Sequence, residues 1–137
     1  MKKSFLPSVI AGLLLLCLNF NANAQSQKKD KPVVVPTVNM IQFHLEHRCV
    51  TCLKIEKLTR ITLTKYFPAI PFSLVNVEEK KNEKMSEEFE ATGSALFLYN
   101  PKTGKKKNLT EFAFMKVGNE KLFDTELKKF IQDFLKG

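Results

Sequence analysis

The feature that most constrains the fold is a pair of cysteines, Cys49 and Cys52, together with the patterns on either side of it. Before the pair, residues 38–45 alternate in a way that gives a β-strand one strongly apolar face. After it, residues 49–67 contain neither Gly nor Pro and stop before Pro68, which predicts a helix. The two thiols therefore lie where a strand passes into a helix.

The rest of the chain continues the alternation of strands and helices. The patterns predict, in order, a strand at 72–77, a helix at 80–91, a strand at 95–99, a strand at 105–109 and a helix through 122–135. We expect an α/β fold, βαβ followed by ββα. Its first two strands should be parallel, its last two should form an antiparallel hairpin, and helices should cover both faces of a mixed sheet.

Two sets of apolar side chains are candidates for the core. In the helix at 49–67 we expect burial of Leu53, Ile55, Leu58, Ile61 and Leu63. Between the hairpin and the last helix, Phe112, Phe114 and Met115 have no assigned element. We expect them in the core as well, and an apolar patch that faces a partner is the alternative.

The N-terminal segment predicts export. Lys2 and Lys3, an apolar run and Ala22-Asn23-Ala24 are typical of a signal peptide at 1–24 that is cleaved after Ala24. A polar tether at 25–37 would then precede a domain at 38–137. We expect a bacterial periplasmic or secreted protein with no stable membrane span after cleavage. A membrane anchor and a lipidated Cys17 are the alternatives.

The position of the cysteines predicts redox chemistry. A thiol at a helix N-terminus meets unpaired N–H groups and the positive end of the helix dipole, which favour the thiolate. We therefore expect Cys49 to be the nucleophile and Cys52 to resolve mixed disulfides, with Arg48 and His47 as electrostatic support. The predicted activity is that of a thiol–disulfide oxidoreductase acting on the thiols and disulfides of exported proteins, together with a redox partner protein.

Two alternatives to redox chemistry remain open. The pair could form a fixed structural disulfide, although a ring this small removes little entropy from the unfolded chain. Alternatively, His44, His47, Cys49 and Cys52 fall within nine residues and offer the nitrogen and sulfur ligands that zinc or copper accepts. The chain would then be a metal-binding module.

Other classes of function lack the motifs they need. The chain has no Gly-rich phosphate loop, and Leu53 rather than His follows the second cysteine, which excludes a c-type haem; we expect no cofactor. The formal net charge is +8, but part of it lies outside the domain at 38–137, because residues 1–37 hold five lysines against one aspartate. The run Lys105-Lys106-Lys107 follows a turn sequence and is typical of a charged edge strand, so we expect no nucleic-acid partner.

Four stretches carry a resemblance to known proteins. They are F-H-L-E-H-R-C-V-T-C-L-K-I-E from Phe43, V-N-V-E-E-K-K-N from Val75, G-S-A-L-F-L-Y from Gly93 and L-T-E-F-A-F-M from Leu109. The domain resembles the thioredoxin-like superfamily and, more narrowly, the family named nitrophenyl compound nitroreductase subunit ArsF. This resemblance implies a small exported bacterial protein of thioredoxin-like fold, and the family name suggests a non-catalytic partner subunit of a reductase system.

The chain departs from ordinary thioredoxins near the cysteines. By the resemblance, Ser94 stands where thioredoxins carry the cis-proline that faces the disulfide, and Phe43 where they carry a buried acid. Ser94 is thus a candidate for the loop opposite the cysteines. Since loss of that proline lets metals compete for the thiols in this fold, Ser94 also favours the metal alternative.

Overall fold

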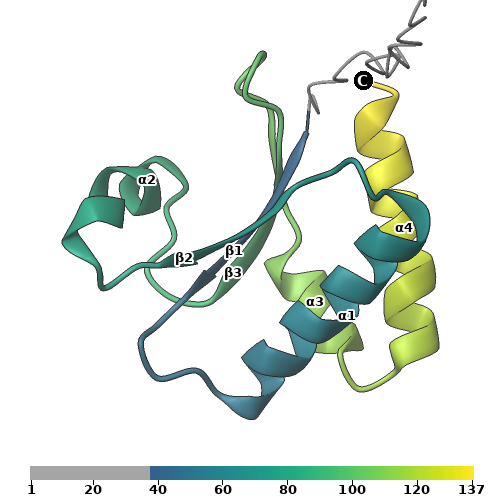
Figure 1. Ribbon diagram of the computed structural model, residues 1–137, viewed down its shortest axis with the longest axis horizontal. Helices are drawn as coiled ribbons and strands as arrows, with labels where there is room; N and C mark the ends of the chain where they lie inside the picture. The colour runs from purple at the N-terminus through teal and green to yellow at the C-terminus, as the bar shows by residue number, and fades with distance from the viewer. Residues whose placement is uncertain (1–37) are drawn as a thin grey trace, which may run out of the picture. The chain divides into compact units, whose positions relative to one another are not determined.

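The computed structural model of the protein describes residues 38–137, which form an α/β unit around one mixed sheet (Figure 1). The strands are β1 (Asn39–His44), β2 (Phe72–Asn76), β3 (Ala95–Tyr99) and β4 (Lys106–Asn108), in the spatial order β2-β1-β3-β4. β1 and β2 are parallel, while β3 is antiparallel to both β1 and β4. The predicted thioredoxin-like class, with its parallel pair and its hairpin, is confirmed.

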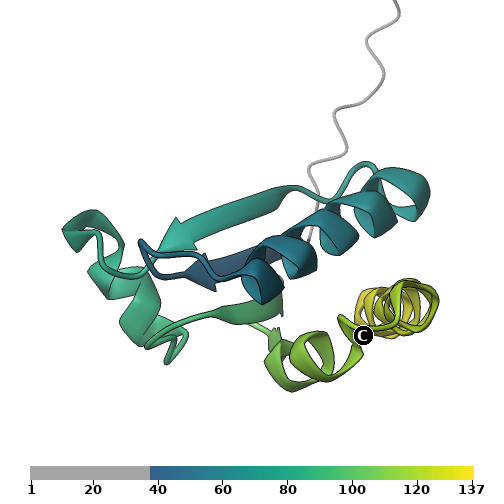
Figure 2. The same cartoon turned by 90° about the horizontal axis from the view of Figure 1, so that it is seen from below.

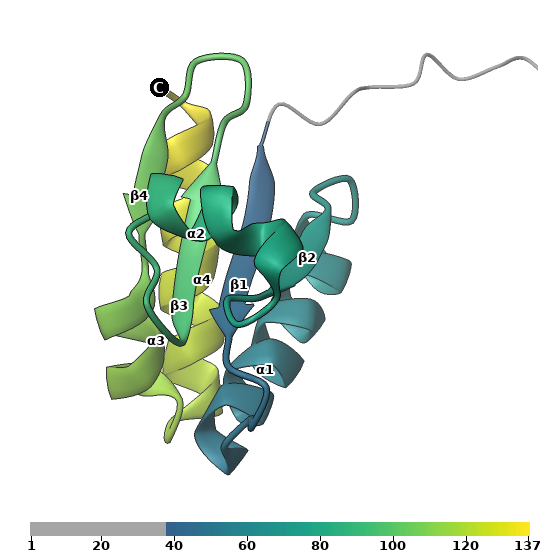
Figure 3. The ribbon, with the colours of Figure 1, turned by 90° about the vertical axis from the view of Figure 1, so that its left-hand side faces the viewer.

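Helices cover both faces of the sheet, as predicted (Figures 1 and 3). One face carries α1 (Val50–Tyr66), α3 (Thr110–Lys116) and α4 (Glu120–Leu135). The other carries α2 (Glu83–Glu88), preceded by a 3-10 turn at Lys80–Asn82. The helix predicted at 80–91 is therefore a short composite, and it ends before Glu90, whose φ of 52° is left-handed.

The central strand β1 is buried on both faces. Met40 and Ile41, neighbours that point to opposite sides of the sheet, are both inaccessible to solvent. The larger core lies under α1, α3 and α4 and includes Met40, Ile55, Leu58, Leu98, Phe123, Leu127 and Ile131. The smaller core, under α2, consists of Ile41, Phe43, Val75, Phe89, Ala91 and Phe97.

Two predictions about the core are wrong in part. Leu53 and Ile61 are about half exposed, because the face of α1 that contacts the sheet carries Cys52, Ile55, Leu58, Thr59, Thr62 and Leu63 instead. Phe112 is buried as expected, but Phe114 and Met115 are exposed. The reason is that 110–116 form a helix, α3, which the sequence analysis missed, and only one side of a helix this short contacts the core.

On one face of the sheet α1, α3 and α4 pack together, with α1 and α4 adjacent (Figure 2). None of the helices between residues 38 and 137 is long and apolar enough to cross a membrane. The predicted signal peptide at 1–24, the tether at 25–37 and Cys17 lie outside the described residues.

Candidate functional site

Cys49 is the N-cap of α1, so its position follows from the end of β1 and the start of the helix. Its backbone is extended, and its sulfur accepts a hydrogen bond from the Cys52 N–H at 3.3 Å. A polar side-chain atom that receives the N–H of the third helical residue is the usual N-cap arrangement, here made by sulfur. The cap thus holds an exposed thiol at the helix N-terminus.

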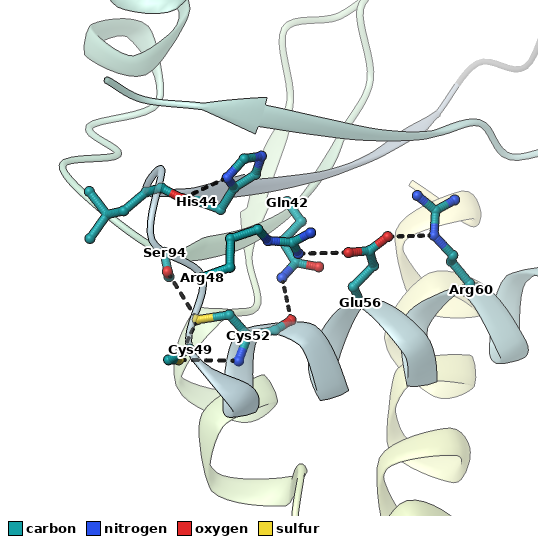
Figure 4. A network of polar contacts seen from close by, with 9 residues as sticks. Gln42, His44, Arg48, Cys49, Cys52, Glu56, Arg60 and Ser94 are labelled. Carbon is teal, nitrogen blue, oxygen red and sulfur yellow. Dashed lines mark hydrogen bonds and ion pairs between the residues drawn. The ribbon is translucent and has the colours of Figure 1, made fainter. Parts of the chain in front are cut away.

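The two cysteines are free thiols whose sulfur atoms lie 2.9 Å apart (Figure 4). The pKa of Cys49 is lowered, first by the hydrogen bond from the Cys52 side chain and next by that from the Cys52 N–H. The pKa of Cys52 is raised, first by burial and next by the hydrogen bond with Cys49. When the pair holds one proton, that proton belongs on Cys52 and the charge on Cys49.

Cys52 is held by the sheet at two atoms. Its sulfur lies 3.2 Å from Ser94 Oγ, at the entrance to β3, and its carbonyl oxygen accepts a hydrogen bond from Gln42 Nε2 at 2.9 Å. Gln42 is a buried residue of β1, and Cys52 itself is only 4% exposed. Ser94 therefore lies against the buried thiol, on the loop where the sequence analysis expected it.

Arg48 is engaged away from the thiols, contrary to the expectation that it supports Cys49 electrostatically. Its Nη2 forms an ion pair with Glu56 Oε2 at 2.6 Å, and Figure 4 shows the guanidinium turned towards that carboxylate. Arg60 binds the same carboxylate at 2.8 Å. Burial by itself raises the pKa of Glu56, but hydrogen bonds from Arg60 and Arg48 outweigh it and leave the pKa lowered.

The two histidines do not join the cysteines. His44 Nδ1 contacts the carbonyl oxygen of Leu45 at 2.9 Å, and its ring points away from the sulfur atoms in Figure 4. His47 is exposed on the loop before α1. Between residues 38 and 137, no three His, Cys, Asp or Glu side chains are close enough together to hold a metal ion. The four-ligand site of the metal alternative is therefore not assembled.

Sequence analysis missed two residues of this site, Gln42 and Glu56. Gln42 shares a face of β1 with Met40, so the strand pattern placed it on a definite face, but that face was not expected to be buried. Glu56 and Arg60 are four residues apart on α1, which is a recognisable helical ion-pair spacing. The contact from Arg48 had no such signal, because it joins a loop to a helix.

Comparisons with known proteins add little to this geometry. No protein-family model matches the chain, and no curated protein matches it. One solved structure, described as that of a malarial protein, is 20% identical to the chain, with a TM-score of 0.41. The match covers 59% of this chain and 96% of the malarial one.

Proposed function

We propose that this protein carries out thiol–disulfide exchange on exported partner proteins, with Cys49 as the nucleophile and Cys52 as the resolving thiol. The observation that carries the proposal is the asymmetry of the pair. An exposed sulfur accepts hydrogen bonds at a helix N-terminus, and a buried sulfur lies 2.9 Å behind it. A reactive thiolate backed by a second thiol within bonding reach is what exchange requires.

The reaction has two steps. The Cys49 thiolate attacks one sulfur of a partner disulfide, so that a mixed disulfide forms and the other partner sulfur leaves as a thiolate. Cys52 then attacks the Cys49 sulfur, the protein disulfide forms, and the second partner sulfur leaves with the electron pair. The two thiol protons pass to the two released thiolates. The partner is reduced and the protein is oxidised, and the reverse direction uses the same atoms.

Two further parts of the proposal depend on the sequence alone. Export to the periplasm or beyond the cell depends on the pattern at 1–24, and an oxidising compartment is where such a pair exchanges with exported proteins. Kinship with the nitroreductase subunit ArsF family depends on the quoted motifs. Under that kinship the partner would be a component of a reductase system, to which this protein passes electrons or from which it receives them.

Single-cysteine variants test the proposal. The wild-type protein should reduce the disulfides of insulin in the presence of dithiothreitol faster than dithiothreitol alone. Cys49→Ser should abolish this acceleration, because the buried Cys52 cannot reach a partner. Cys52→Ser, the matched control with the other thiol, should retain the first step and accumulate mixed disulfides that mass spectrometry detects. The proposal is wrong if Cys49→Ser exchanges as fast as the wild type, or if the wild type does not exchange at all. The two cysteines would then have only a structural role.

A further inference from the structure

We propose that Ser94 is a catalytic residue of the second step, in which its hydroxyl donates a hydrogen bond to the Cys52 sulfur as that sulfur becomes a thiolate. The inference rests on the proposed exchange function and assigns the group that stabilises the resolving thiolate. Its basis is the 3.2 Å contact between Ser94 Oγ and Cys52 Sγ. A hydroxyl within hydrogen-bond reach of a buried sulfur is a direct contact with a reacting atom.

The need for such a group arises in the mixed disulfide. There the Cys49 sulfur is covalently bonded and neutral, so it no longer shares a proton with Cys52. Burial opposes ionisation of Cys52 and is the largest cause of its raised pKa. A nucleophile that must ionise at a site only 4% exposed to solvent needs a hydrogen-bond donor inside the protein.

Ser94 is the side chain placed to be that donor. The largest causes that shift the pKa of Cys52 include hydrogen bonds with two side chains, that of Cys49 at the N-cap of α1 and that of Ser94 on the loop before β3, and the hydrogen bond from Ser94 lowers the pKa. Cys49 is the titratable group among these largest causes. The two cations nearest to Cys52 in sequence are both paired elsewhere, Lys54 with Glu120 and Arg48 with Glu56.

The sheet fixes Ser94 and Cys52 relative to each other. Ser94 directly precedes Ala95, which is in register with Phe43 of β1, and the neighbouring Leu96 N–H is bound by Thr110 Oγ1. Gln42 of the same β1 holds the Cys52 carbonyl oxygen. Both partners are therefore anchored to adjacent strands, so the donor is oriented before the charge develops and little reorganisation is needed.

In the resolving step the proton of Cys52 leaves through solvent to the departing partner thiolate, and the Cys52 sulfur attacks Cys49. The Cys49–Cys52 bond forms, the bond from Cys49 to the partner sulfur breaks, and the partner sulfur takes the electron pair. Ser94 keeps its own proton throughout, because a serine hydroxyl is far too weak an acid to give it up at neutral pH. Its role is to stabilise charge.

Stopped-flow reaction of the reduced protein, in excess, with 5,5′-dithiobis(2-nitrobenzoate) separates the two steps. The first yellow thiolate is released when Cys49 attacks, and the second when Cys52 resolves the mixed disulfide. We expect Ser94→Val to slow the second phase about tenfold at pH 7, the loss typical of a hydrogen bond to a charged group. We also expect the pH midpoint of the second phase to rise and the rate of the first phase to stay unchanged. Ser94→Thr has the shape of valine and keeps the hydroxyl, so it should restore both the rate of the second phase and its pH midpoint.

The outcomes separate this inference from the function on which it rests. If Ser94→Val and Ser94→Thr resolve at the same rate with the same pH midpoint, the hydroxyl is not the donor, while exchange by the cysteines stands. If Ser94→Val does not fold, Ser94→Ala against Ser94→Thr makes the same comparison. If the wild-type protein gives no second phase at all, the exchange function itself fails.

Discussion

Gln42, on the central strand, donates a hydrogen bond from Nε2 to the carbonyl oxygen of Cys52 at 2.9 Å. This contact joins the most buried strand to the first turn of α1, and so joins the core to the resolving cysteine. The amide oxygen of Gln42 is buried without a hydrogen-bond partner among the described residues. A buried polar side chain that satisfies only one of its ends stabilises the fold weakly, and the satisfied end of Gln42 is the one that holds the carbonyl group of Cys52.

Substitutions of Gln42 should separate packing from hydrogen bonding. Gln42→Leu keeps most of the volume and removes both the donor and the unpartnered oxygen, so we expect the free energy of unfolding to fall by no more than about 1 kcal/mol. Gln42→Ala leaves a cavity and should cost about 3 kcal/mol. Urea unfolding measures both. Equal losses in the two variants would mean that the amide contributes more than this single bond.

The carboxylate of Glu56 should make stability depend on pH. Its pKa is lowered in the folded protein, so its contribution is present above its unfolded pKa and is lost as pH falls through the folded value. We expect Glu56→Gln to cost about 2 kcal/mol at pH 7, because Arg48 and Arg60 lose a shared, mostly buried partner. The cost should shrink below about pH 4, near the ordinary pKa of glutamate.

Urea unfolding at pH 7 and pH 3.5 checks this prediction. Glu111→Gln, at an exposed position of α3, is the control and should change the free energy of unfolding little at either pH. A cost for Glu56→Gln that is the same at both pH values would show that the two arginines do not stabilise the ionised carboxylate.

The order of elements was predictable because each boundary carries a local signal. Pro68 ends α1, the alternation around Phe43 marks β1, and the turn before Lys105 marks the hairpin, whose Gly104 has the positive φ that a turn residue needs. The missed helix α3 had a weaker signal. Leu109, Phe112 and Ala113 recur at helical spacing, but Phe112 and Phe114 also alternate, and a segment of seven residues is too short to decide between the two patterns.

The site was predictable only as far as it is local in sequence. The N-cap position of Cys49 and the burial of Cys52 follow from the strand-to-helix boundary and the helical period. The ion-pair partner of Arg48 does not follow from these local signals. A loop side chain can turn to either side, and its nearest neighbours in the sequence do not determine to which side it turns. The contact between Ser94 and Cys52 joins residues 42 apart, and only the resemblance to thioredoxins suggested it.

Zinc titration should distinguish the assembled geometry from the four-ligand metal alternative. Within residues 38–137 no three potential ligands converge, so reduced protein should bind zinc through at most the two thiolates. His44→Ala and His47→Ala should leave the affinity unchanged within about twofold, and oxidation of the cysteines should abolish binding. Isothermal titration calorimetry measures each value. A tenfold loss in either histidine variant would mean that the loop rearranges around the metal.

The reactivity of Cys49 should depend on pH in a way set by Cys52. The Cys52 side chain is the largest cause of the lowered pKa of Cys49, so iodoacetamide should alkylate Cys49 with a midpoint below the value of about 8.5 for an ordinary cysteine. Cys52→Ala removes the side-chain donor but keeps the N–H, and the midpoint should rise. Cys52→Ser supplies a hydroxyl donor, so its midpoint should lie between those of the wild type and Cys52→Ala.

Thiolate absorbance near 240 nm gives these midpoints independently of the alkylation rate. If Cys52→Ala and Cys52→Ser titrate together at the ordinary value, the helix N-terminus and the Cys52 N–H do not stabilise the Cys49 thiolate, and the asymmetry of the pair has no chemical consequence.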